Sequence, residues 1–167
     1  MIKIADFSDL NEIVNLRVYQ QIEDWNNTNH KKDYSVYAKS FYKVTKEYLS
    51  QRLNKDIVFA LMYADGKAVS LCGLQVKESL PQITVCENGS EKSAQLVSVY
   101  TVPDCRGRGY MQSLLLFLLD FAKEQGYTDV VLSTNTDDAK HTYEKFGFEY
   151  ISDKYYLRLA DNAKKEK

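Results

Sequence analysis

Hydrophobic and polar residues follow two periods along this chain, and the changes between them predict the order of its elements. Apolar residues spaced three and four apart are typical of helices, whereas short alternating or continuous apolar runs are typical of strands. The predicted helices cover a stretch after Ala5 that includes Leu10 to Val18, then Tyr34–Leu53, Gly107 or Arg108 to Gln125, and Asp137–Phe146. The predicted strands are Ile2–Ala5, Ile57–Tyr63, Ala68–Val76, Ala94–Val102, Val130–Leu132 and Phe148–Leu159. The resulting order, β-α-α-β-β-β-α-β-α-β, predicts one α/β domain over residues 1–160, a mixed sheet with helices on it, and a charged tail at 161–167.

Three local patterns refine this prediction. Asp65-Gly66, between two strand-like runs, predicts a tight hairpin turn. The helix after residue 107 has a continuous apolar face and ends at Gly126, a typical helix C-cap. The second helix carries a mostly aromatic stripe made of Tyr34, Tyr37, Phe41, Val44 and Tyr48.

Composition excludes several classes of protein. The 167 residues include 22 Lys plus Arg and 23 Asp plus Glu, a net charge of -1 that argues against a nucleic-acid binder. No apolar run approaches the ~20 residues of a membrane span, and the N-terminus lacks a secretory apolar segment, so we expect a cytoplasmic protein without membrane contact. Cys72, Cys86 and Cys105 form no CxxC pair, and His30 lies far from His141. The sequence therefore predicts unpaired thiols and no metal site.

The segment between the strand ending at Val102 and the longest apolar helix carries the most chemical information. It reads Arg106-Gly107-Arg108-Gly109. The first turn of a helix has main-chain N–H groups without intrahelical partners, and together with the helix dipole they attract an anion. Glycines allow close approach to the backbone, and the two arginines add positive charge at the rim. A pyrophosphate group would fit this turn.

Several anion-binding patterns compete for this turn. A P-loop needs a Lys-Ser/Thr pair after its last glycine, where this chain has Tyr110-Met111, so that pattern fails. A dinucleotide fingerprint needs a third glycine at the position of Gln112 and an earlier place in the chain. The glycines of this short motif could also serve chain reversal alone.

Three features make the chain resemble the GNAT superfamily of acetyl-CoA-dependent N-acyltransferases. Its Arg/Gln-x-x-Gly-x-Gly/Ala motif is similar to residues 106–111, with Met111 in place of the last small residue. Val99-Tyr100-Thr101-Val102-Pro103 resembles the VYT-x-P strand end of one branch of the family. A second motif, Asn-x-x-Ala-x-x-x-Tyr-x-x-x-Gly-Phe, is matched by Ala139, Tyr143, Gly147 and Phe148, with Thr136 at the place of the asparagine. The resemblance covers nearly the whole chain and implies a mostly antiparallel GNAT-like sheet.

The resemblance implies acetyl-CoA as the acyl donor. Main-chain N–H groups from Gly107 to Gln112 would take its pyrophosphate, and the strand edge would bind its pantetheine arm like an added strand. The cofactor-binding residues implied in this way are Val99, Tyr100, Thr101, Arg106, Gly107, Arg108, Gly109, Tyr110, Met111, Gln112 and Thr136.

The reaction implied is direct attack of a neutral amine on the thioester. Tyr143 would be the general acid that protonates the leaving thiolate, although a core tyrosine on that helix face is the alternative. No base is assigned: Glu23, Asp24, Glu87, Glu91 and water alone all stay open. The family builds its acceptor pocket from the first two helices, and this stretch offers Tyr19, Glu23, Asp24, Trp25, Tyr34 and Tyr37.

Three functions follow from these observations. The first is an N-acetyltransferase acting on an amine of a small molecule or peptide. The second is a non-catalytic acyl-CoA-binding module, suggested because residues 94–102 carry no carboxylate. The third is a protein that binds another nucleotide at residues 106–109. A homodimer is an expectation from the family alone.

Overall fold

The computed structural model describes residues 1–28, 32–78, 80, 81, 83, 85, 86, 92–134 and 137–150. The chain divides into two compact units, Met1–Leu132 and Ser133–Lys167. Each unit is described by itself below.

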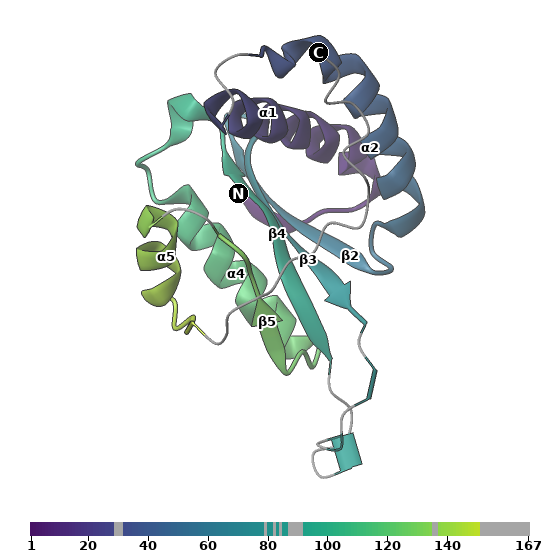
Figure 1. Ribbon diagram of the computed structural model, residues 1–167, viewed down its shortest axis with the longest axis vertical. Helices are drawn as coiled ribbons and strands as arrows, with labels where there is room; N and C mark the ends of the chain where they lie inside the picture. The colour runs from purple at the N-terminus through teal and green to yellow at the C-terminus, as the bar shows by residue number, and fades with distance from the viewer. Residues whose placement is uncertain are drawn as a thin grey trace, which may run out of the picture. The chain divides into compact units, whose positions relative to one another are not determined.

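The first unit contains a sheet whose strands follow chain order across it. The strands are β1 (Ile2–Ile4), β2 (Ile57–Ala64), β3 (Lys67–Lys77), β4 (Ser93–Thr101) and β5 (Asp129–Val131), in the order β1-β2-β3-β4-β5 (Figure 1). Neighbours from β1 to β4 are antiparallel, and β5 is parallel to β4. The prediction of a mixed, mostly antiparallel sheet is confirmed. Asp65 and Gly66 form the two-residue turn between β2 and β3, both with positive φ, as the Asp-Gly pair predicts.

Helices of the first unit cover both faces of this sheet. They are α1 (Leu10–Thr28), α2 (Ala38–Arg52) and α4 (Tyr110–Glu124). Alternate β2 residues point to opposite faces. Ile57, Phe59 and Leu61 join the core formed with α1 and α2, which lie side by side in Figure 1. The buried side chains of α4, such as Leu118, lie outside that cluster, and α4 packs against β2 and β3 from the other face.

The start of the second helix differs from the prediction. Tyr34–Tyr37 form a 3₁₀ turn, and the α-helix begins at Ala38. Within α2, Thr45 and Leu49 are buried, and Val44 and Tyr48 from the aromatic stripe are exposed.

The second unit contains α5 (Asp137–Glu144), which ends in a well-formed cap. The Phe148 N–H donates to the Tyr143 carbonyl, the Gly147 N–H donates to the Glu144 carbonyl, and Gly147 has φ +85°. This pattern is a Schellman motif, and the rings of Tyr143 and Phe148 make its usual apolar contact, 5.7 Å between centroids.

The predicted strand Phe148–Leu159 has no counterpart in its first residues, because 148–150 form no strand. The rest of that strand and the tail at 161–167 lie outside the described residues. Among the described helices, none has both the length and the apolar character that crossing a membrane requires.

Candidate active site

The strand β4 bends and loses one neighbour in its second half. Tyr100 pairs with Leu71 and Val97 pairs with Gly73, so one extra residue of β4 bulges opposite Cys72. Ser98 adopts φ +57° there, in the left-handed region that side chains other than glycine rarely enter. Pairing with β5 covers residues 93–95 and stops. Within the described part of the chain, residues 96–101 of β4 have no strand on their β5 side.

The glycine turn follows directly and leads into α4. Gly107 and Gly109 have φ +73° and +75°, so both need a residue without a Cβ, and Gly109 is the N-cap of α4. The first main-chain hydrogen bond of the helix runs from Ser113 N–H to the Gly109 carbonyl, at 3.1 Å. Among the described residues, no main-chain acceptor faces the N–H groups of 107–112.

A cavity of about 210 Å³ lies against this turn. It is lined by Thr101, Cys105, Arg106, Gly107, Gly109, Tyr110, Met111 and Gln112. The donors at the start of α4 and this cavity together form a site suited to an anion, because the helix dipole adds its positive end at the same place.

The side chain of Arg106 does not extend over this cavity as a free positive charge. Its Nη2 donates to the Glu23 carboxylate at 2.7 Å, and its Nε donates to the Thr101 carbonyl at 2.9 Å. The Tyr100 hydroxyl donates to the same carboxylate at 3.1 Å, and burial, followed by the charge of Glu23, raises the pKa of Tyr100 to about 12. The expected rim charge of Arg106 is thus compensated by Glu23, a residue of α1. Arg108 forms no ion pair within the described residues and donates to the Asp104 carbonyl.

The main-chain carbonyls of the predicted strand edge accept hydrogen bonds from side chains. The Tyr100 side chain is buried in the core cluster, and its carbonyl accepts from Ser70 Oγ at 2.9 Å. The Val99 carbonyl accepts a long hydrogen bond, 3.5 Å, from the Gln20 side chain. Thr136 lies outside the described residues.

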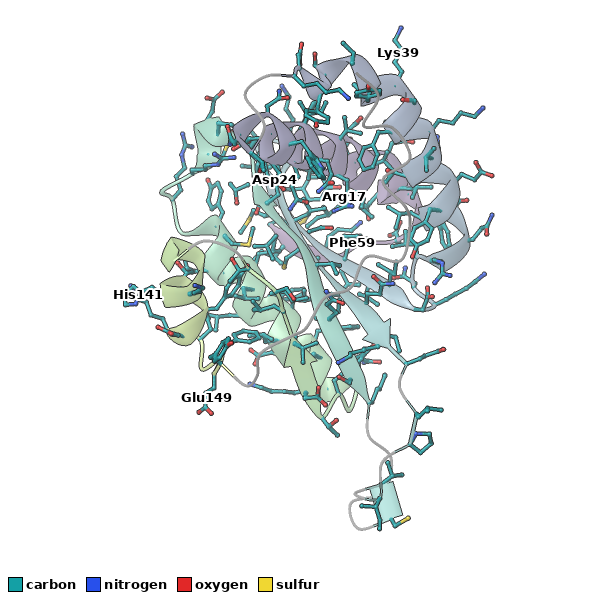
Figure 2. The ribbon with its side chains drawn as sticks, viewed as in Figure 1. Arg17, Asp24, Lys39, Phe59, His141 and Glu149 are labelled. Carbon is teal, nitrogen blue, oxygen red and sulfur yellow. The ribbon has the colours of Figure 1, made fainter. Side chains whose placement is uncertain are left out.

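Two residues of α1 at this strand were missed by sequence reasoning. Arg17 Nη1 donates to Ser98 Oγ at 2.7 Å, and Gln20 reaches Val99. In Figure 2, Arg17 and Asp24 both extend from α1 on its side toward the sheet. The available signal was a polar interruption in the apolar stripe of this helix, at Arg17 and Gln20.

Tyr143 lies in the second unit, where its main-chain carbonyl and its ring support the Schellman cap. The cap by itself accounts for the spacing of Tyr143, Gly147 and Phe148 in the sequence motif. The role of Tyr143 as a general acid therefore stays a prediction.

Five of the six residues expected to form the acceptor pocket fall into two groups, and Asp24 belongs to neither. Trp25, Tyr34 and Tyr37 form a chain of ring contacts, with centroids 5.6 and 6.1 Å apart, and Lys32 lies over both tyrosines. Another cavity, of about 360 Å³, is mainly apolar and is lined by Tyr19, Ile22, Glu23, Tyr100, Val102 and Pro103.

The candidate bases Glu23 and Asp24 have different surroundings in the structure. Glu23 accepts from Arg106 and Tyr100, whereas burial, followed by the charge of Glu23, raises the pKa of Asp24. Glu87 and Glu91 lie outside the described residues.

Known proteins match this chain over most of its length. The model of the acetyltransferase (GNAT) family matches residues 19–148. N-acetyltransferase 8B of Rattus norvegicus is 36% identical over 94 residues, which are 56% of this chain and 37% of that protein. N-acetyltransferase 8 of Homo sapiens is 28% identical over 119 residues, 70% of this chain and 48% of that protein. The chain thus spans half or less of these relatives.

Among solved structures, a predicted acetyltransferase from Clostridium acetobutylicum, crystallised with acetyl-CoA, superimposes with a TM-score of 0.75. It is 21% identical, and the superposition covers 95% of this chain and 96% of that one. At this identity the likeness shows that the fold is shared.

Proposed function

The chain belongs to the acetyltransferase (GNAT) family, and on this premise we propose that it transfers an acetyl group from acetyl-CoA to a primary amine. The observation that carries the proposal is the run of main-chain N–H groups at 107–112, which have no main-chain acceptor in the described residues and line a cavity at the start of α4. These donors suit the two phosphates of a pyrophosphate group, because a helix N-terminus stabilises negative charge.

Acetyl-CoA fits the residues around this turn. The pyrophosphate would accept from the N–H groups of 107–112, where Gly107 and Gly109 leave room beside the backbone. Arg108 would add a charge at the rim, whereas Arg106 would act by joining the turn to Glu23. The pantetheine arm would lie along residues 99–101 of β4, whose edge has no β5 partner, and would bind as an added strand does.

The proposed chemistry is direct attack by a neutral amine. The amine loses a proton, its nitrogen bonds to the thioester carbon, and the C–S bond breaks to release a thiolate that takes up a proton. Tyr143 is the proposed donor of that proton. Asp24, with its raised pKa, suits a proton acceptor better than Glu23, whose carboxylate is engaged by two donors, although water alone also suffices.

Calorimetric titration with acetyl-CoA, followed by an amine panel with detection of the released thiol, tests this function. We expect acetyl-CoA to bind, ATP and NAD to leave it bound, and at least one amine to be acetylated. Binding without turnover would favour the acyl-CoA-binding module, and displacement by ATP would favour the nucleotide-binding protein. The homodimer and the cytoplasmic location stay predictions, which light scattering and cell fractionation would test.

A further inference from the structure

One stripe of α1 changes character halfway along the helix. Leu10, Ile13, Arg17, Gln20 and Asp24 are three or four residues apart, so they share one face of the helix. Leu10 and Ile13 pack in the core, as a sheet-facing stripe should. The last three positions are polar, and α1 crosses β3 and β4. Two of these polar side chains, Arg17 and Gln20, contact β4 at Ser98 and Val99.

Arg17 is the best-defined member of this polar segment. Its Nη1 donates to Ser98 Oγ at 2.7 Å and to Gln20 Oε1 at 3.3 Å, and the side chain is partly buried. Its Nε and Nη2 have no acceptor among the described residues, and no described carboxylate lies within ion-pair distance. A guanidinium removed from water without a carboxylate partner is unfavourable. Burial lowers the pKa of Arg17, and Asp24 opposes this shift only from a distance, two helical turns away.

The unused edge of Arg17 has a specific shape. Nε and Nη2 present parallel N–H donors that match the two oxygens of a carboxylate. The used edge, at Nη1, holds the guanidinium against Ser98, which lies in the bulge of β4, beyond the residues that pair with β5. Under the proposed function, the acyl end of the pantetheine arm lies along this part of β4. A carboxylate held there would be attached to the amine that attacks the thioester.

We propose that Arg17 binds a carboxylate of the acceptor, so that the acceptor is an amino acid or another small amine with a carboxylate beside its nitrogen. This rests on the proposed function. A peptide N-terminus carries a neutral amide at that position and would leave the Arg17 fork without a partner. Under the proposed function the pyrophosphate of CoA binds the N–H groups of 107–112, so it is not the partner of Arg17.

Matched substrates test this inference. Each of several α-amino acids, with aliphatic, aromatic and acidic side chains, is compared with its methyl ester in the wild type and in Arg17→Gln. Glutamine still offers an N–H to Ser98 but lacks both charge and fork. Because the ester lowers the basicity of the amine, the acid-to-ester ratio of kcat/KM is compared between the two proteins. That ratio should fall roughly tenfold to a hundredfold in Arg17→Gln, as expected for a charged hydrogen-bond pair. Ester turnover should fall far less than turnover of the acid, and acetyl-CoA affinity should be unchanged.

Other outcomes overturn the inference. An equal loss for acid and ester would mean that Arg17 supports the bulge or stabilises the oxyanion, and an unchanged ratio would mean that it does not contact the acceptor. Acetylation of carboxylate-free amines alone would refute this inference while the proposed function stands, whereas failure of acetyl-CoA to bind would refute both. If acetyl-CoA binds without turnover, calorimetry with N-acetyl amino acids in the presence of CoA gives the same comparison, and binding that does not depend on Arg17 refutes the inference.

Discussion

Replacing Gly109 with alanine should weaken acetyl-CoA binding far more than it destabilises the fold. Gly109 is the N-cap of α4 and has φ +75°. A Cβ added there meets Gln112 Oε1 at 4.0 Å, so the protein has room for it. The new methyl group instead projects beside the N–H groups that we propose bind the pyrophosphate. It also strains the turn that aligns them.

Two magnitudes follow from this geometry. A residue with a Cβ in the left-handed region costs about 1–2 kcal/mol, which is the expected loss in the free energy of unfolding. Displacing the phosphate from one N–H group removes a charged hydrogen bond worth about 1.5–3 kcal/mol. At 1.4 kcal/mol for each factor of ten, the dissociation constant for acetyl-CoA should rise roughly tenfold to a hundredfold.

Gly66 provides a matched control. It lies in the turn between β2 and β3, also with φ +75°, and a Cβ there meets no atom within 4 Å. Gly66→Ala should therefore lower the free energy of unfolding, measured in urea, by the same amount, about 1–2 kcal/mol. Its acetyl-CoA affinity by calorimetry should equal that of the wild type.

The comparison has a clear refuting result. If Gly109→Ala binds acetyl-CoA as tightly as Gly66→Ala does, the N–H groups after Arg106 are not the phosphate site. This holds whether both variants keep the affinity of the wild type or both lose affinity equally through general destabilisation. In either case the assignment of the glycine turn as the pyrophosphate site is wrong.

Three further predictions concern packing, chemistry and pH. Gly73→Ala should cost about 1–3 kcal/mol in urea unfolding, because its Cβ would lie 2.7 Å from the Phe59 ring, and an additive effect with Phe59→Leu would contradict this. Tyr143→Phe should keep the ring contact of the α5 cap and acetyl-CoA affinity but lower kcat, and undiminished kcat would exclude it as the acid. Stability should fall as the pH rises from about 10 to 12, because folding raises the pKa of Tyr100 to about 12, so the unfolded chain loses that proton first. Alkaline unfolding of Tyr100→Phe should lack this part of the loss.

Local features of the fold could be predicted from the sequence because they depend on neighbouring residues. The Asp65-Gly66 turn follows from two adjacent residues that tolerate positive φ. The glycine turn and α4 follow from Gly107, Gly109 and the apolar face of the helix. The chain's periodicity likewise predicts the order of strands and helices. The structure differs from the predicted elements at the start of the second helix, where Tyr34–Tyr37 form a 3₁₀ turn, and at residues 148–150, which form no strand.

The amino-acid sequence by itself thus determined the family motifs and the glycine turn that we propose binds the pyrophosphate, because its donors come from consecutive peptide groups. Only the tertiary structure decided how the rest of the site is built. The contact of Arg17 with Ser98 spans 81 residues, and that of Glu23 with Arg106 spans 83. These pairs exist because α1 packs across β4, which bulges at Ser98 and parts from β5. Such distances between side chains depend on the packing of whole elements, and no local pattern of residues encodes them.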